Sequence, residues 1–267
     1  MQSFPLDEAV IATEVATDAA SSGPERSVLA LEIVARSHAG RVRGNNEDSI
    51  AFLSLSGIAV LADGMGGLNA GEVASREAAD RVLKGLGAGM GMQQVVEDAN
   101  ASIFELSRSD AELNNMGTTL VALQLVDNQM WLANVGDSRI YRFRDQTLDQ
   151  LTCDHSVVQQ LVDSGLMTAA EARQAPNRNI ITRALGIEAT VEVDVLEEQP
   201  QASDLYMLCS DGVTDMLEPE ELQALFVAHS APSLLVDAIV DAANTAGGFD
   251  NISVILVTVT GKKGAAT

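Results

Sequence analysis

Apolar positions along the chain predict strands first and helices next. Alternating apolar residues over 29–35 predict one strand. The apolar stretch 49–62 predicts two strands rather than a helix, because Gly57 interrupts it. Apolar residues then recur at helical spacing over 73–86 and again over about 92–113, which predicts two helices.

The middle of the chain returns to a strand-like composition. Runs rich in Leu, Val, Ile and Tyr over 117–126 and 129–143 predict a series of strands. A helical stretch is predicted after residues 154–156. Thr168 followed by Glu171 has the spacing of a capping box, which predicts a further short helix.

The last third of the chain adds strands at 191–195 and 205–209, a helix from Pro219, a helix over 234–242 and a closing strand at 252–259. Strands, helices and strands in this order do not alternate as in a parallel α/β fold. The pattern favours an α+β domain whose helices pack on sheet faces.

Length and composition indicate one large domain with short ends. The chain has 267 residues, of which 46% are hydrophobic, enough for a sizeable core. Residues 1–28 are small, acidic and aperiodic, and we expect them to form a flexible acidic N-terminal tail. The domain then spans 29–260, and 261–267 form a C-terminal tail.

The formal net charge of −22 excludes a general attraction to nucleic acid or to anionic membrane. A phosphate-bearing substrate would need bound cations or a well-placed Arg to offset that charge. Cys153 and Cys209 form no C-x-x-C pair, which argues against a disulfide framework or a zinc site and for the cytoplasm. The N-terminus has no secretory signal pattern, and the longest uncharged apolar stretch, 49–62, is too short to span a bilayer.

Acidic residues stand at the ends of apolar strands in four places, usually beside a glycine. They are Asp63-Gly64, Gly136-Asp137, Ser210-Asp211-Gly212 with Asp215 four residues on, and Asp250-Asn251. If these strands share a core, the carboxylates can converge at one end of the sheets. Any single Asp-Gly after a strand is more often a plain turn, but four together favour a metal site.

The residue types also restrict the metal. Carboxylates held close together repel one another unless cations or raised pKa values relieve the repulsion. Oxygen ligands without a cysteine or histidine cluster suit Mg²⁺ or Mn²⁺ rather than zinc. A glycine lets the backbone approach closely, so the Gly64 carbonyl could serve as a further ligand.

The segment 40–48 combines a cation with two adjacent acids. Glu47 and Asp48 can point to different partners. Arg43 could hold a phosphate through two parallel hydrogen bonds. From this segment alone, a surface salt bridge is the simpler interpretation.

Taken in order, six motifs make the chain similar to the metal-dependent protein phosphatases of the protein phosphatase 2C type, and to their bacterial members above all. The similarity covers about residues 29–259. The motifs are Arg43-x-x-Asn46-Glu47-Asp48, Ala62-Asp63-Gly64-Met65-Gly66-Gly67, Gly117-Thr118-Thr119, Asn134-Val135-Gly136-Asp137-Ser138-Arg139, Ser210-Asp211-Gly212 and Asp250-Asn251-Ile252.

This resemblance implies a four-layer α-β-β-α sandwich: two antiparallel sheets flanked by helices, with the active site at one end. It also implies a bacterial-type flap over 157–186. Asp63 would bridge two Mn²⁺ or Mg²⁺ ions. Asp211 and Asp250 would complete the coordination of one ion, and Glu47 and the Gly64 carbonyl would complete that of the other.

The resemblance further assigns Asp48 to orient metal-bound water and Arg43 to grip the substrate phosphate. Asp137 would hold a third, weaker ion with Asp211 or Asp215. A hydroxide bridging the two main ions would attack phosphorus in line. Met65 stands where many eukaryotic relatives have a proton-donating His, so the leaving group would take its proton from metal-bound water. Leu68 and His38 also depart from common family residues.

The implied activity is hydrolysis of phosphoserine and phosphothreonine in proteins, reversing a cognate bacterial Ser/Thr kinase in signal transduction. Phosphorylated proteins would be the partners, and we expect a monomer. His38, His155 and His229 receive no catalytic role, and Cys209 is expected in the core. Two alternatives stay open: a small-molecule phosphomonoesterase using the same site, and a non-catalytic module that senses phosphoproteins. A nuclease is disfavoured by the negative charge.

Overall fold

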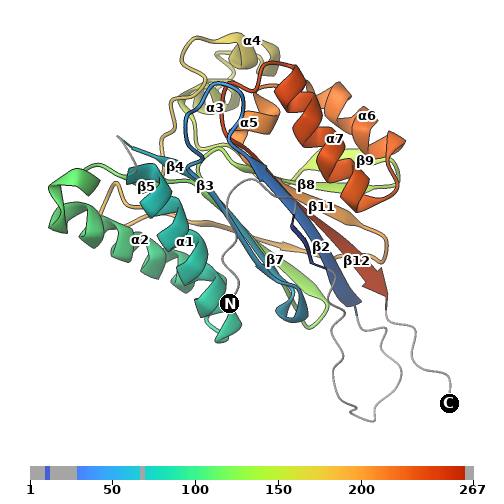
Figure 1. Cartoon of the computed structure of the whole chain (residues 1–267), viewed down its shortest axis with the longest axis horizontal. Coiled ribbons are helices and arrows are strands. Elements are labelled where there is room, and N and C mark those ends of the chain that lie inside the picture. The colour runs from blue at the N-terminus through green and yellow to red at the C-terminus, as the bar shows by residue number, and fades with distance from the viewer. Residues whose placement is uncertain (1–9, 13–28, 67–69, 262–267) are drawn as a thin grey trace.

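Two antiparallel sheets packed face to face form the centre of the molecule, with helices on both outer faces (Figure 1). The computed structural model describes residues 10–12, 29–66 and 70–261. One sheet has the strand order β1 (Val10–Ala12), β2 (Leu29–His38), β12 (Ile252–Gly261), β11 (Leu205–Cys209), β8 (Arg139–Arg144) and β9 (Thr147–Gln150).

The other sheet has the order β10 (Asp194–Glu198), β7 (Gln129–Val135), β6 (Leu120–Val126), β4 (Ile58–Met65) and β3 (Asp48–Leu53). A short strand, β5 (Gly117–Thr118), pairs with the end of β4. Short 3₁₀ turns occur at Ser54–Ser56 and Ala111–Leu113. All the strand pairs are antiparallel.

Helices cover each sheet on its outer side. The β3–β4 sheet carries α1 (Ala70–Gly87) and α2 (Met92–Ser109), and the β2–β12 sheet carries α5 (Asp211–Thr214), α6 (Pro219–Ala228) and α7 (Pro232–Thr245). Two short helices, α3 (Val157–Asp163) and α4 (Ala169–Gln174), stand apart around a small core of Val158, Ala172 and Ala175. None of the helices in the described residues is long and apolar enough to cross a membrane.

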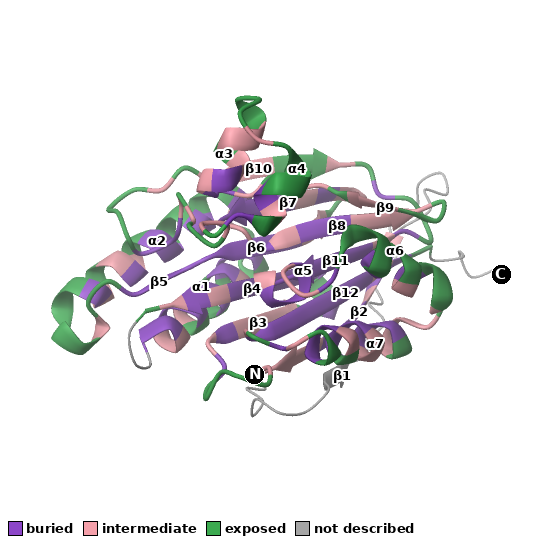
Figure 2. Cartoon of the chain, turned by 90° about the horizontal axis from the view of Figure 1, so that it is seen from above, coloured by how far each residue is buried: buried purple, intermediate pink, exposed green. Residues whose placement is uncertain are grey.

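Strand alternation explains how one strand fills two cores. In β4, Ala59 and Leu61 pack between the sheets, whereas Val60 and Ala62 pack under α1. Strands buried on both faces are therefore apolar almost without interruption, and Figure 2 shows β4, β6, β11 and β12 largely buried.

The predicted α+β sandwich is confirmed, and most predicted elements lie where the apolar pattern puts them. The capping box of Thr168 and Glu171 opens α4, and Pro219 is the first residue of α6. The strand predicted at 191–195 is misplaced, because β10 begins only at Asp194. Val191 and Val193 instead pack against the core under α2 as irregular chain.

Three short elements escape the sequence pattern: β1, β9 and α5. The strand β9 reads Thr-Leu-Asp-Gln, and α5 has four residues, so neither shows a clear period. β1 lies within the predicted N-terminal tail and pairs with β2. The other residues of that tail, and 262–267, lie outside the described residues.

Tyr206 offers a test of the core between the sheets. Its side chain is fully buried, and its hydroxyl has no hydrogen-bond partner in the described part of the chain. Burying an unsatisfied hydroxyl costs about 1–3 kcal/mol, so we expect Tyr206→Phe to raise the free energy of unfolding by about 1 kcal/mol. Urea unfolding measures it.

Tyr141→Phe is the matched control, because the Tyr141 hydroxyl accepts a hydrogen bond from Arg139 Nη1 at 3.1 Å. Losing that bond leaves a guanidinium donor without its partner, so this variant should lose about 1 kcal/mol. Equal destabilisation by both substitutions would contradict the difference between the two hydroxyls.

Candidate functional site

At one end of the sandwich, the side chains between the sheets change from apolar to polar. Along β11, Tyr206 and Leu208 face the other sheet, and Ser210 is the next residue of that row. On β12, Ile255 belongs to the same core, and Ser253 precedes it by two residues. Because side chains alternate along a strand, these hydroxyls continue the inter-sheet layer as a polar rim.

Asp48 lies on this rim. It is 1% exposed, and its Oδ2 accepts a hydrogen bond from Ser210 Oγ at 2.9 Å. The Ser210 hydroxyl oxygen in turn accepts from the Ser253 backbone N–H at 3.0 Å. The other oxygen, Asp48 Oδ1, is buried without a partner among the described residues. Burial, relieved in part by these hydroxyls, raises the pKa of Asp48 to about 6.

Asp63 stands opposite Asp48 in the β3–β4 ladder. Its backbone is fixed on both sides: its N–H donates to Thr119 Oγ1 at 3.0 Å, and its carbonyl accepts from Thr118 Oγ1 at 2.8 Å. The side chain makes none of these bonds, so the carboxylate is positioned by the backbone. Burial, and then the charges of Asp48 and Asp211, raise the pKa of Asp63 well above its usual value.

Gly64 lies where three segments meet. Its N–H donates to the Glu47 carbonyl at 3.1 Å. A Cβ at this position would lie 2.1 Å from the carbonyl oxygen of Gly71 and 2.6 Å from that of Glu47. Only glycine at position 64 therefore lets the start of α1, and Glu47 just before β3, pack against β4.

Asp211 opens α5 directly after β11. One carboxylate oxygen, Oδ1, is buried and has no partner in the described part of the chain. Burial raises the pKa of this carboxyl well above its usual value, and the charges of Asp137 and Asp250 raise it further. Burial and the charge of Asp154 likewise raise the pKa of Asp137, to about 6. The mutual effects place these acids in one electrostatic cluster.

Asp250 and Arg43 form an ion pair across the mouth of this cluster. Arg43 Nη2 lies 2.7 Å from Asp250 Oδ2, and its side chain remains 52% exposed. Hydrogen bonding to Asp250 raises the pKa of Arg43, which stays charged. Glu47 is half-buried beside them, and burial raises the pKa of its carboxyl. The surface salt bridge considered from the sequence alone thus exists, but its acidic partner is Asp250.

Asn251 holds the loop that carries Arg43 and Glu47. Its Nδ2 donates to the carbonyls of Ala39 and Asn45, and its Oδ1 accepts from the Glu47 N–H at 2.8 Å. The sequence motif that contains Asn251 assigns it no role of its own. Ser210 and Ser253 could be recognised from the sequence, because each places a hydroxyl where the strand pattern predicts an apolar side chain. Asn251 has no comparable feature.

Asp215 is placed differently from the other predicted ligands. It ends α5, and its Oδ2 lies 3.4 Å from Nε of Arg178, in the segment that follows α4. His155, which received no catalytic role, is buried, and its Nδ1 accepts from the Gly136 N–H at 3.0 Å. Cys209 is buried, as expected. Leu68 lies outside the described residues.

The carboxylates lie near one another but do not already have the arrangement of a complete metal site. Within residues 29–66 and 70–261, no three Asp, Glu, His or Cys side chains are arranged to hold a metal ion as they stand. The chemistry nevertheless fits hard divalent cations: the donors are all oxygens, and two buried carboxylate oxygens, Asp48 Oδ1 and Asp211 Oδ1, lack partners. Cations there would relieve the repulsion that raises the pKa values.

Comparisons with known proteins agree with this geometry. The family model "Protein phosphatase 2C" matches residues 36–242. The chain is 38% identical over 235 residues to the serine/threonine phosphatase stp of Listeria monocytogenes, which covers 83% of this chain and 93% of the relative. It is also 38% identical over 248 residues to the serine/threonine protein phosphatase PstP of Mycobacterium tuberculosis, covering 88% of this chain and 46% of that longer protein.

Solved structures show the same fold. The catalytic domain of PstP, in complex with two manganese ions, superposes with a TM-score of 0.79 at 34% identity, covering 87% of this chain and all (100%) of that one. The phosphatase Stp1 of Staphylococcus aureus superposes with a TM-score of 0.79 at 29% identity, covering 91% of this chain and 100% of that one.

The buried carboxylates predict an unusual pH dependence of stability. In the metal-free protein the pKa values of Asp48 and Asp137 are about 6, above the value of 3.8 expected in the unfolded chain. The folded state therefore binds more protons between these values, and the free energy of unfolding should fall as pH rises from about 4 through about 6. Thermal unfolding in EDTA from pH 4.5 to 7.5 measures this slope.

Mn²⁺ should reverse the trend, because ligands must lose their protons to bind. We expect a larger rise in Tm on adding Mn²⁺ at pH 7 than at pH 5. Asp48→Asn should flatten the metal-free slope, and Asp98→Asn, on the exposed face of α2, should leave it unchanged. A metal-induced shift of equal size at both pH values would contradict the carboxylate assignment.

Proposed function

The chain belongs to the protein phosphatase 2C family and is a metal-dependent protein phosphatase, and on that premise we propose that it hydrolyses phosphoserine and phosphothreonine in proteins with two Mn²⁺ or Mg²⁺ ions. The observation that carries the proposal is the cluster of buried carboxylates at the end of the sandwich, where Asp48 and Asp211 each retain an unpaired oxygen. A site so rich in negative charge can act on a phosphate only with cations present.

We propose the following ligands. Asp63, Asp211 and Asp250 would hold one ion, and Asp63, Glu47 and the Gly64 carbonyl would hold the other. Asp137 holds a third, weaker ion with Asp211 or Asp215. When bound, the two main ions would lower the pKa of a water molecule so that it can attack phosphorus, and would offset the charge of the phosphate oxygens.

Asp48 is suited to orient a water molecule. Ser210 occupies one of its carboxylate oxygens, which fixes the carboxyl group and leaves Oδ1 as an acceptor. Burial raises the pKa of this carboxyl to about 6 in the metal-free protein, and bound cations would lower it, so Asp48 would be a charged hydrogen-bond acceptor at neutral pH. Met65, by contrast, carries no proton to give to the leaving oxygen, so a water molecule on a bound metal ion would have to supply it.

Arg43 is suited to receive the substrate phosphate. Its guanidinium is half exposed and holds Asp250 through one nitrogen only, Nη2. An arginine can exchange a carboxylate for a phosphate and bind it through two parallel hydrogen bonds. Arg43 thus provides positive charge at the mouth of an otherwise acidic site.

The proposal extends to the protein's setting. We propose a monomeric cytoplasmic enzyme whose domain, residues 29–260, reverses a cognate Ser/Thr kinase in signal transduction. Phosphorylated proteins are its substrates. Two free cysteines, Cys153 and Cys209, are consistent with a reducing compartment.

The metal ligands can be tested with isosteric substitutions. We expect Asp63→Asn and Asp211→Asn to lower Mn²⁺-dependent release of phosphate from a phosphothreonine peptide at least about 100-fold, because each removes a charged ligand from the ions. Folding should survive, since the backbone of Asp63 is anchored through Thr118 and Thr119. Circular dichroism checks the fold, and Asp98→Asn should keep wild-type activity.

The same assay separates the alternatives. EDTA should abolish wild-type activity and Mn²⁺ should restore it; phosphothreonine peptide should be preferred to sugar phosphates and phosphotyrosine peptide. Preference for a sugar phosphate would make the protein a small-molecule phosphomonoesterase. Binding of phosphopeptide without turnover would make it a sensing module.

Arg43→Ala should mainly weaken substrate binding. Losing a charge-assisted contact to phosphate costs about 1.5–3 kcal/mol, so we expect KM to rise about 10- to 100-fold with a smaller change in kcat, and inhibition by inorganic phosphate to weaken in parallel. Arg76→Ala, which breaks only a surface pair with Glu72, is the control. An unchanged KM would remove the phosphate-binding role.

A further inference from the structure

Arg41 differs from the other cations of the protein. In the parts of the chain that the structure describes, every other arginine and lysine forms an ion pair with a carboxylate, except Arg108, whose guanidinium lies 5.5 Å from the ring centre of Phe104. The Arg41 side chain is exposed and has neither kind of partner there. In a chain with net charge −22, a cation left unpaired next to an active site calls for an explanation.

The backbone of Arg41 is fixed beside the catalytic residues. Its N–H donates to the Gly248 carbonyl at 2.7 Å. The preceding residue, Gly40, has φ of +80°, and a Cβ there would lie 2.2 Å from the Asp250 carbonyl oxygen. The loop is therefore pressed against the turn that leads to Asp250, and Arg43 follows two residues later.

A cavity of about 460 Å³ opens next to Arg41. It is lined by His38, Arg41, Asp241, Asn244 and Thr245, between the β2–β3 loop and the end of α7. His38 Nδ1 accepts from the Gly40 N–H at 2.8 Å, so Nε2 carries the proton of a neutral ring and can donate. Asp241 lies 3.1 Å from Arg36, which also pairs with Asp237 at 3.0 Å. Among these lining residues, Arg41 is the arginine that forms no ion pair in the described part of the chain, so its guanidinium is free to bind an anion.

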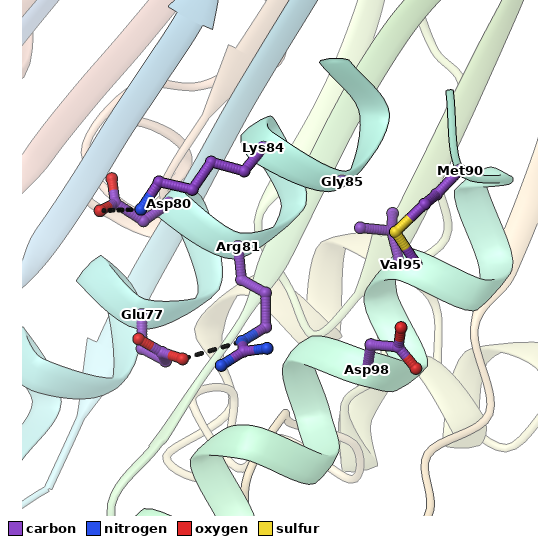
Figure 3. Close-up of a pocket in the computed structure, with 8 residues that line it drawn as sticks. All are labelled: Glu77, Asp80, Arg81, Lys84, Gly85, Met90, Val95 and Asp98. Carbon is purple, nitrogen blue, oxygen red and sulfur yellow. Dashed lines mark hydrogen bonds and ion pairs between the residues drawn. The ribbon is translucent and has the colours of Figure 1, made fainter. Parts of the chain in front are cut away.

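A second cavity, of about 410 Å³ between α1 and α2, shows the contrast (Figure 3). Its two cations point at carboxylates of the same helix: Arg81 pairs with Glu77 at 2.8 Å and Lys84 with Asp80 at 3.1 Å. Its cations are internally satisfied, so it offers no free positive charge to a ligand.

We propose that Arg41, with His38, forms a second anion-binding subsite that recognises an acidic or phosphorylated side chain within two residues of the phosphoserine or phosphothreonine being hydrolysed. This inference rests on the proposed function. Two residues span at most about 7 Å of chain, so Arg41 and Arg43 can lie about as far apart as alternate side chains of an extended substrate. A local cation also lowers the repulsion that an acidic substrate meets on this acidic surface.

The test uses phosphothreonine peptides in which one Glu is placed at −2, −1, +1 or +2 in an otherwise alanine background. At low salt we expect the wild type to favour at least one Glu peptide over the all-alanine parent by about two- to five-fold in kcat/KM, the range of an exposed charge pair. Replacing that Glu with a second phosphothreonine shows whether carboxylate or phosphate is preferred.

Arg41→Gln keeps the side-chain stem that packs on Gly248 and should reduce the preference to about one. Arg41→Glu should reverse the preference, so that a peptide with Lys in place of that Glu becomes the better substrate. Arg108→Gln, which removes the other unpaired arginine, should retain the wild-type preference. Arg41→Gln and Arg108→Gln should keep the wild-type kcat on saturating p-nitrophenyl phosphate, because neither substitution touches the proposed ligands or Arg43.

The outcomes separate the two proposals. Failure of the wild type to hydrolyse any phosphopeptide would overturn the proposed function. Hydrolysis without preference for any Glu position, or a preference that survives in Arg41→Gln, would overturn the Arg41 subsite and leave the phosphatase assignment intact.

Discussion

Repulsion among buried carboxylates is the constraint that the rest of this structure has to satisfy. Asp48, Asp63 and Asp211 share one end of the sandwich. Burial raises the pKa of each, and the charges of neighbouring acids raise it further. Such groups would separate if their side chains were free to move. The protein prevents this through the backbone: Asp63 is anchored by bonds to its own N–H and carbonyl, and Asp211 is the first residue of a helix that follows a buried strand. The favourable packing of the two sheets offsets the electrostatic repulsion among these carboxylates.

Strand parity determines which way these acids face. Along β4, Ala59 and Leu61 fill the inter-sheet core, and Asp63 is the next residue with the same orientation. Along β3, Ile50 and Phe52 pack against the same core, and Asp48 precedes them in the row. A shift of one residue in either strand would turn the carboxylate toward α1. The apolar core between the sheets therefore sets the register that positions the chemistry.

The sequence predicts what depends on local pattern and misses what depends on encounters between distant segments. The long apolar strands and helices lie where the apolar pattern predicts them, and the acids can be identified because each stands at the end of an apolar run. The strand β10 was misplaced, since Val191 and Val193 are buried without entering the ladder. Nothing in the local sequence indicates that Arg43 pairs with Asp250, 207 positions away, or that Asn251 fastens the 39–47 loop. Such contacts arise only once two sheets and a loop have packed together, and no periodicity encodes them.

The helix α5 shows how much of the site is held from outside. A four-residue helix has too few internal hydrogen bonds to be stable alone, so the position of Asp211 must come from tertiary contacts. Gly212 packs so closely on the start of β12 that a Cβ would lie 2.0 Å from the Asn251 carbonyl oxygen. On the other side, Arg173 of α4 donates to the carbonyls of Thr214 and Leu217, the usual way in which a cation satisfies a helix end. The strand β12 thus packs against the start of α5, and the α3–α4 segment holds its end. The α3–α4 segment has only a small apolar core, formed by Val158, Ala172 and Ala175. It contributes to the site through the hydrogen bonds that Arg173 donates to the end of α5.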